Sequence, residues 1–136
     1  MEKMTKNPAP PHIRLLLVDD EVGFVDVLSK RISRRGIDVT TAASGSEAIQ
    51  TLRRQDFDVA VLDLKMEDMG GIEVLKIFKK MDPNMPVIML TGHGSEHSAR
   101  EGKKFGAYDY LTKPYELDDL IQKIKEAIRQ KGNSDE

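Results

Sequence analysis

The sequence has 136 residues, which suits one domain with a continuous hydrophobic core. Its net charge of −2 offers no basic excess for nucleic acid, and the absence of cysteine excludes disulfides, thiol catalysis and thiolate metal sites. No apolar run approaches the roughly 20 residues that span a bilayer, and the first residues lack the apolar segment of a signal peptide, so we expect a soluble, cytoplasmic protein.

Residues 1–11 contain several prolines among polar residues and predict a flexible leader. We expect one folded domain at residues 12–130 and a polar tail at 131–136. Within the domain, short runs rich in aliphatic or β-branched residues predict strands at 13–18, 38–41, 59–62, 87–90 and 108–111. The stretches between them have helical spacing, clearest in the apolar face of the last one, formed by Leu117, Leu120, Ile121, Ile124 and Ile128.

Strict alternation of strands and helices predicts an α/β fold with a parallel sheet, right-handed crossovers and helices on both faces. The expected helix ends carry suitable residues. Ser44 or Ser46 can cap the second helix, and Ser95 can cap the fourth. Gly36 and Gly106 each follow a basic last turn, as is typical after a helix C-terminus.

In an open parallel sheet, ligands bind beyond the carboxyl ends of the strands, so the residues that end each strand are the candidates for chemistry. Most of these ends carry a polar group, whereas the second strand ends in small residues. The candidates are the acids Asp19, Asp20 and Asp63, the hydroxyl of Thr91 and the ammonium of Lys113.

This set of groups has a chemical logic. Oxygen ligands suit Mg²⁺, and a cation would stabilise Asp19 and Asp20 as neighbouring anions. With Mg²⁺ present, a carboxylate can act as nucleophile toward a phosphoryl group, while an ammonium and a hydroxyl stabilise the charge on its oxygens. Taken singly, each residue has an ordinary explanation as a turn residue, a helix cap or a solvated lysine. Their convergence at one edge of the sheet favours a site.

Four motifs occur in order along the chain: "LLLVDDE", "DVAVLDLKM", "VIMLTGHG" and "FGAYDYLTKP". Together they resemble the receiver domain of two-component response regulators, over residues 12–130. The resemblance implies a flavodoxin-like (βα)5 fold with strand order 2-1-3-4-5. It implies phosphorylation at Asp63, a phosphoryl contact from Lys113 and a cis peptide bond between Lys113 and Pro114. The Mg²⁺ ligands it implies are Asp20, Asp63 and the backbone carbonyl of Lys65, with Asp19 acting through water.

Thr91 and Tyr110 match the switch pair of this family. The resemblance implies that on phosphorylation the threonine hydroxyl moves toward the phosphoryl group and the aromatic ring rotates inward. Tyr110 considered alone is equally consistent with a core aromatic whose hydroxyl reaches the surface. Lys65 and His93 match positions that flank the path of attacking water in the family.

The sequence departs from the family after the acceptor, in "LKMEDMGG". Glu67 stands where proline is usual, and Gly70 where an acidic or amide residue is common. Because proline fixes φ, its absence predicts a more mobile loop, and Glu67 and Asp68 add negative charge there. His93 and His97 have the i, i+4 spacing of a zinc pair, but without a third ligand nearby we interpret them as exposed histidines.

The resemblance implies a histidine kinase or phosphotransfer protein as phosphodonor, and a downstream protein or effector domain that binds the face around Tyr110. A homodimer is left open. No catalysis is expected beyond the domain's own phosphorylation and dephosphorylation. Residue 130 is followed by too few residues for an output domain, so the chain is interpreted as a stand-alone receiver or a fragment of a longer regulator.

Three alternative functions can be compared with the sequence. A phosphatase of the haloacid dehalogenase type needs a second acid two residues after the nucleophile, where this chain has Lys65. A flavodoxin-like FMN protein needs a loop rich in Ser, Thr or Gly after the first strand, and "DDEVGF" is acidic. A degenerate receiver, which binds partners without phosphorylation, stays open.

Overall fold

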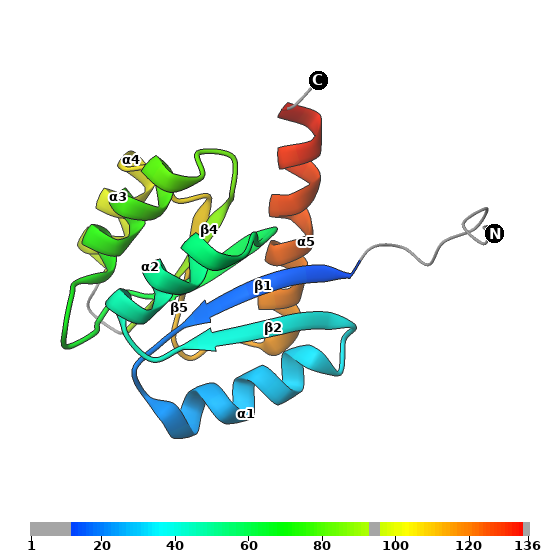
Figure 1. The fold of residues 1–136 in the computed structure, drawn as a ribbon. Helices are drawn as coiled ribbons and strands as arrows, with labels where there is room; N and C mark the ends of the chain where they lie inside the picture. Colours follow the sequence, from blue (N-terminus) through cyan, green and yellow to red (C-terminus); the bar gives the residue numbers. More distant parts are fainter. Residues whose placement is uncertain (1–11, 93–95, 135–136) are drawn as a thin grey trace.

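The computed structural model describes residues 12–92 and 96–134, in which strands and helices alternate along the chain (Figure 1). In chain order the elements are β1 Ile13–Val18, α1 Val22–Ser33, β2 Ile37–Ala42, α2 Gly45–Arg54, β3 Val59–Asp63, α3 Gly71–Met81, β4 Val87–Thr91, α4 Glu96–Lys104, β5 Asp109–Thr112 and α5 Leu117–Ser134.

The strands form one parallel sheet in the order β2-β1-β3-β4-β5, which confirms the predicted fold. The register of the strands places their carboxyl ends at similar heights in the sheet. Val18 of β1 pairs with Leu62 of β3, so Asp19 and Asp63 follow at the same height. Thr91 pairs with Thr112 on the neighbouring strand, just before Lys113. The predicted site residues therefore share one edge of the sheet.

Helices cover both faces of the sheet (Figure 1). On one face, α1 and α5 pack against alternate residues of the strands through side chains such as Leu28, Ile32 and Leu120. On the other face, α2 and α3 pack against the intervening residues, and Phe78 of α3 is fully buried there. Residues of β3 and β4 are buried on both sides, as expected for the central strands of a parallel sheet.

The predicted boundaries differ slightly from the observed ones. β2 is longer by one residue at each end, β3 and β4 include Asp63 and Thr91, and β5 begins one residue later than predicted. The extensions arise because a strand continues as long as its neighbour supplies hydrogen bonds, whatever its side chain. The last helix continues past residue 130 to Ser134, into the predicted tail, since one glycine weakens a helix without ending it.

The predicted helix ends are confirmed where the structure describes them. Ser44 is the N-cap of α2, and its hydroxyl accepts a hydrogen bond from the Glu47 backbone N–H. Gly36 and Gly106 have φ of 81° and 110°, a conformation that favours glycine. Ser95 lies outside the described residues. Among the described residues, no helix has the length and apolar character of a membrane span.

Candidate functional site

The predicted acids converge at the carboxyl edge of the sheet. Asp19 and Asp20 follow β1, and Asp63 ends β3. One carboxylate oxygen from each lies within 4.8 Å of the others. These three residues, called the carboxylate cluster below, could hold a metal ion through oxygen ligands.

Burial makes two carboxylates of the cluster costly to ionise. Asp19 is 1% exposed and Asp63 is 6% exposed. Burial raises the pKa of Asp19 to about 6. Burial also raises the pKa of Asp63, although the positive charge of Lys113 opposes this effect. A cation among these groups would offset the desolvation and the mutual repulsion.

Each carboxylate of the cluster accepts one hydrogen bond from the chain, and the three donors come from different segments. The donors are the Glu21 backbone N–H to Asp19 Oδ1 at 3.0 Å, the Glu67 backbone N–H to Asp20 Oδ2 at 3.0 Å, and Lys113 Nζ to Asp63 Oδ1 at 3.3 Å. These donors orient the cluster, but they leave other oxygens available for a metal or its water.

One of these available oxygens is buried. Asp19 Oδ2 has no hydrogen-bond partner among the described residues. A buried acceptor without a donor is costly, and a metal-bound water or a cation would satisfy it. The chemistry of the donor set therefore fits a hard divalent cation such as Mg²⁺.

Lys113 reaches the acceptor position from the end of β5. Its backbone N–H donates to the Thr91 carbonyl at 2.8 Å, which fixes the start of the β5–α5 loop. The peptide bond between Lys113 and Pro114 is cis, as the resemblance implied. The ammonium is half-buried between Asp63 and the Phe24 ring of α1, with its nitrogen 4.9 Å from the ring centroid.

Thr91 and Tyr110 lie on adjacent strands but differ in burial. Thr91 is fully buried, and its hydroxyl lies 3.4 Å from the Leu111 carbonyl oxygen and 3.5 Å from the Thr112 hydroxyl. Both distances exceed the roughly 2.8 Å typical of hydroxyl donors, so the hydroxyl is weakly held. Tyr110 is half-buried and packs against the core beneath α2 and α3.

The loop between β3 and α3, residues 64–70, borders the cluster. Lys65 is exposed and lines a shallow depression together with Asp20 and Glu67. Asp68 accepts hydrogen bonds from the backbone N–H groups of Gly45 and Ser46, both at 3.1 Å. The negatively charged Asp68 thus sits at the N-terminus of α2, and these bonds lower the pKa of its carboxyl.

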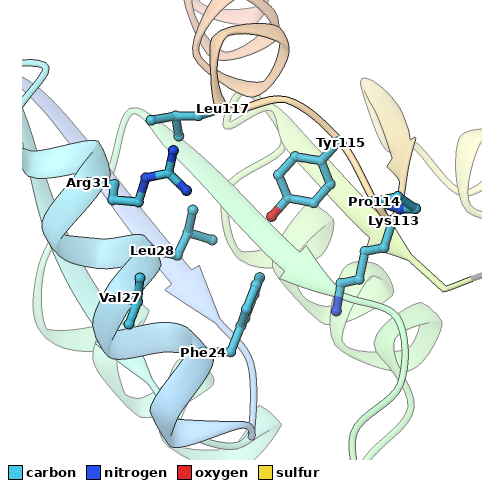
Figure 2. Close-up of a pocket in the computed structure, with 8 residues that line it drawn as sticks. All are labelled: Phe24, Val27, Leu28, Arg31, Lys113, Pro114, Tyr115 and Leu117. Carbon is cyan, nitrogen blue, oxygen red and sulfur yellow. The ribbon is translucent and has the colours of Figure 1, made fainter.

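A cavity of about 320 Å³ lies beside Lys113, between α1 and the start of α5 (Figure 2). The Tyr115 hydroxyl points into this region and is buried without a hydrogen-bond partner among the described residues. Burial and the charges of Asp19 and Asp63 raise the pKa of Tyr115 to about 12. The sequence analysis did not single out Tyr115, although its place directly after "LTKP" is a signal that it lies near the site.

The structure brings together most of the predicted site residues but leaves the histidine pair untested. His93 lies outside the described residues, and His97 is exposed on α4. Two further contacts were missed by the sequence analysis: the cap that Asp68 provides for α2 and the hydrogen bond from the Glu67 backbone. Both contacts join segments that are distant in sequence, so no local sequence pattern predicts them.

The similarities to known proteins agree with this geometry. The family model of the response regulator receiver domain matches residues 15–125. The transcriptional regulatory protein GlrR of Escherichia coli (strain K12) is 40% identical over 121 residues, which are 89% of this chain and 27% of GlrR. The curated relatives are longer proteins, of which this chain spans, for example, 27% in one case and 51% in another.

Solved structures show the same fold. A response regulator receiver domain protein from Clostridium thermocellum has a TM-score of 0.85 and 34% identity, covering 88% of this chain and 97% of that chain. A CheY-like receiver domain protein from Methanospirillum hungatei JF-1 has a TM-score of 0.86 and 31% identity, covering 91% of this chain and 99% of that chain. With its sheet order, its carboxylate cluster and a family match over most of its length, the chain belongs to the response regulator receiver domain family.

Proposed function

We propose that this receiver accepts a phosphoryl group on Asp63 from a histidine kinase or phosphotransfer protein, with Mg²⁺ as cofactor. The observation that carries the proposal is the position of Asp63, which lies in the carboxylate cluster and 3.3 Å from Lys113 Nζ. A buried carboxylate with an ammonium on one side and metal ligands on the other is arranged for nucleophilic attack on a phosphoryl group.

In the proposed transfer, an Asp63 oxygen attacks the phosphorus of a phosphohistidine while the P–N bond breaks and the imidazole leaves. The positive charge of Lys113 favours the ionised form of Asp63 against the effect of burial, and its ammonium would stabilise negative charge on the phosphoryl oxygens. Bound Mg²⁺ would supply further charge stabilisation there. Its proposed ligands are the carboxylates of Asp20 and Asp63 and the backbone carbonyl of Lys65, with Asp19 acting through water.

The proposed switch uses the contrast between Thr91 and Tyr110. The Thr91 hydroxyl has only long contacts, so little is lost when it turns toward a phosphoryl oxygen. Tyr110 is half-buried and packs at the border of the core, where an inward rotation of its ring can bury more of it. Phosphorylation would then bias a packing arrangement with two states and alter the face formed by α4, β5 and α5.

The proposed partners follow from the family and from the relatives. The relatives include transcriptional regulators, and the chain spans only part of their length. We therefore propose that the altered face binds an effector domain or a separate protein, with a homodimer as one form of that contact. The proposed setting is the cytoplasm, and the proposed chemistry is limited to the receiver's own phosphorylation and dephosphorylation.

Intact-mass spectrometry after incubation with acetyl phosphate tests this function. We expect one phosphoryl adduct on the wild type with Mg²⁺, none with EDTA, and none on Asp63→Asn under either condition. The asparagine variant is a matched control because it preserves size and one oxygen but lacks the nucleophilic carboxylate. An adduct that persists in Asp63→Asn would contradict the assignment of the acceptor. Absence of any adduct with several donors would favour a phosphorylation-independent binding module.

A further inference from the structure

The β3–α3 loop is attached to the rest of the domain on two sides. On one side, Asp68 caps the N-terminus of α2 through backbone N–H groups and the Ser46 hydroxyl. On the other side, the Glu67 backbone N–H donates to Asp20 Oδ2 at 3.0 Å. The sequence predicted a more mobile loop because proline is absent, yet this second attachment depends on that absence.

Proline has no backbone N–H and could not make the bond to Asp20. At position 67 the family resemblance leads one to expect proline, whereas this chain has a residue that can donate. The Glu67 side chain is exposed and makes no hydrogen bond or ion pair within residues 12–92 and 96–134. The contribution of Glu67 to the site therefore comes from its backbone.

The bond matters because of where Asp20 lies. Its carboxylate is one of three that come within 4.8 Å of one another, and close carboxylates repel. Asp19 and Asp63 each have a donor of their own, so the Glu67 N–H completes the set. With all three donors in place, the carboxylate oxygens already converge as metal ligands.

We infer that the Glu67 backbone N–H is a positioning donor for Asp20, which fixes this carboxylate for Mg²⁺ and couples metal binding to the position of the β3–α3 loop. The inference rests on the proposed Mg²⁺ site. Loss of the donor would let the Asp20 carboxylate turn away from Asp19 and Asp63. This change of orientation weakens metal binding, and partners of this kind commonly contribute tenfold or more to metal affinity.

The test compares two substitutions at one position. Glu67→Pro removes both the side chain and the backbone N–H, whereas Glu67→Ala removes the side chain alone. Mg²⁺ affinity is measured by NMR shift titration, which needs no tryptophan reporter in a chain that has none. We expect Glu67→Pro to bind Mg²⁺ about tenfold more weakly than the wild type, and Glu67→Ala to stay within about twofold.

A further variant separates the hydrogen bond from general loosening of the loop. Asp68→Ala removes the attachment to α2 and leaves the Glu67 N–H in place. Its effect on Mg²⁺ affinity should be clearly smaller than that of Glu67→Pro. An equal loss in Asp68→Ala would show that loop order alone is responsible and would overturn the inference.

The amide resonance of Glu67 gives a readout that does not involve the metal. In EDTA, a charge-assisted bond to Asp20 should shift this proton downfield, and Asp20→Ala should return it by several tenths of a ppm or more. An unchanged resonance, or equal Mg²⁺ affinity for Glu67→Pro and the wild type, would refute the positioning role. Failure of the wild type to bind Mg²⁺ would instead refute the proposed metal site.

Discussion

The amino and carboxyl edges of the sheet can be compared through the hydrogen-bond partners of their polar groups. At the amino edge, Asp58 accepts a hydrogen bond from the Arg14 backbone N–H at 2.8 Å and two from its guanidinium at 3.2 and 3.1 Å. Lys79 Nζ donates to the carbonyl oxygens of Pro83 and Met85, both at 2.9 Å. These charged groups have close partners.

At the carboxyl edge, the partners are fewer or more distant. Asp19 Oδ2 and the Tyr115 hydroxyl are buried without partners among the described residues. The Thr91 hydroxyl has only long contacts, and Lys113 Nζ lies 3.3 Å from Asp63. Polar groups are thus closely paired at the amino edge and incompletely paired at the carboxyl edge. Incomplete pairing of this kind is common where function conflicts with stability.

Two half-buried lysines give the largest expected contrast. Lys113→Ala should slow phosphorylation by acetyl phosphate about 100-fold, because it removes the ammonium, 3.3 Å from Asp63, that we propose stabilises the phosphoryl oxygens. Lys79→Ala should leave that rate within about twofold but lower the free energy of unfolding by about 1–2 kcal/mol, since two carbonyl oxygens lose their donor. Mass spectrometry of samples quenched at successive times measures the phosphorylation rate, and urea unfolding measures the free energy of unfolding. Similar rates for both variants would remove the distinction between the edges.

The second prediction concerns pH. Burial raises the pKa of Asp19 to about 6, above the value of about 3.9 in an unfolded chain. The folded state therefore holds this proton more tightly, so the metal-free protein should gain about 2–3 kcal/mol from this group as pH falls from 7 to 4. Urea unfolding in EDTA across this range measures the gain. Asp19→Asn should lack it, and parallel curves for the two proteins would contradict the assignment.

Asp58 should behave in the opposite way. Burial alone would raise the pKa of Asp58, but the hydrogen bonds from Arg14 outweigh this effect and lower the pKa in the folded state. Its contribution to stability is therefore present above the unfolded pKa of about 3.9 and is lost as pH falls through the lower, folded value.

The smallest contrast is between two carboxylate-to-amide substitutions at pH 7 without metal. Asp58→Asn should lower the free energy of unfolding by about 1 kcal/mol, because the pair with Arg14 is partly exposed. Asp19→Asn should raise it by about 1 kcal/mol, because the variant no longer buries a charge. Chemical denaturation of both variants provides the measurement. A destabilised Asp19→Asn would show that its charge is already compensated.

The sequence predicted the carboxyl edge well because parallel strands place their ends together. Asp19, Asp63 and Lys113 could be assigned to one edge from the order of strands alone, and the register confirms it. The amino edge was less accessible to prediction. Lys79 was not predicted to have a structural role, because only the path of the following loop shows which carbonyl oxygens it reaches.

The contacts of the β3–α3 loop could not be predicted for a related reason. Asp68 lies 22 residues beyond Ser46, and Glu67 lies 47 residues beyond Asp20. Bonds from a backbone N–H carry no residue preference except the exclusion of proline. The unusual Glu67 could therefore be recognised in the sequence, but its bond to Asp20 required the folded chain.

The proposed function requires that Asp63 be the residue that carries the phosphoryl group. Borohydride reduction of the phosphorylated protein, followed by peptide mapping, tests it most directly because reduction converts an aspartyl phosphate to homoserine. We expect homoserine at position 63 after treatment with acetyl phosphate and Mg²⁺. Homoserine at Asp19 or Asp20, or a phosphoryl adduct without any reduced aspartate, would contradict it.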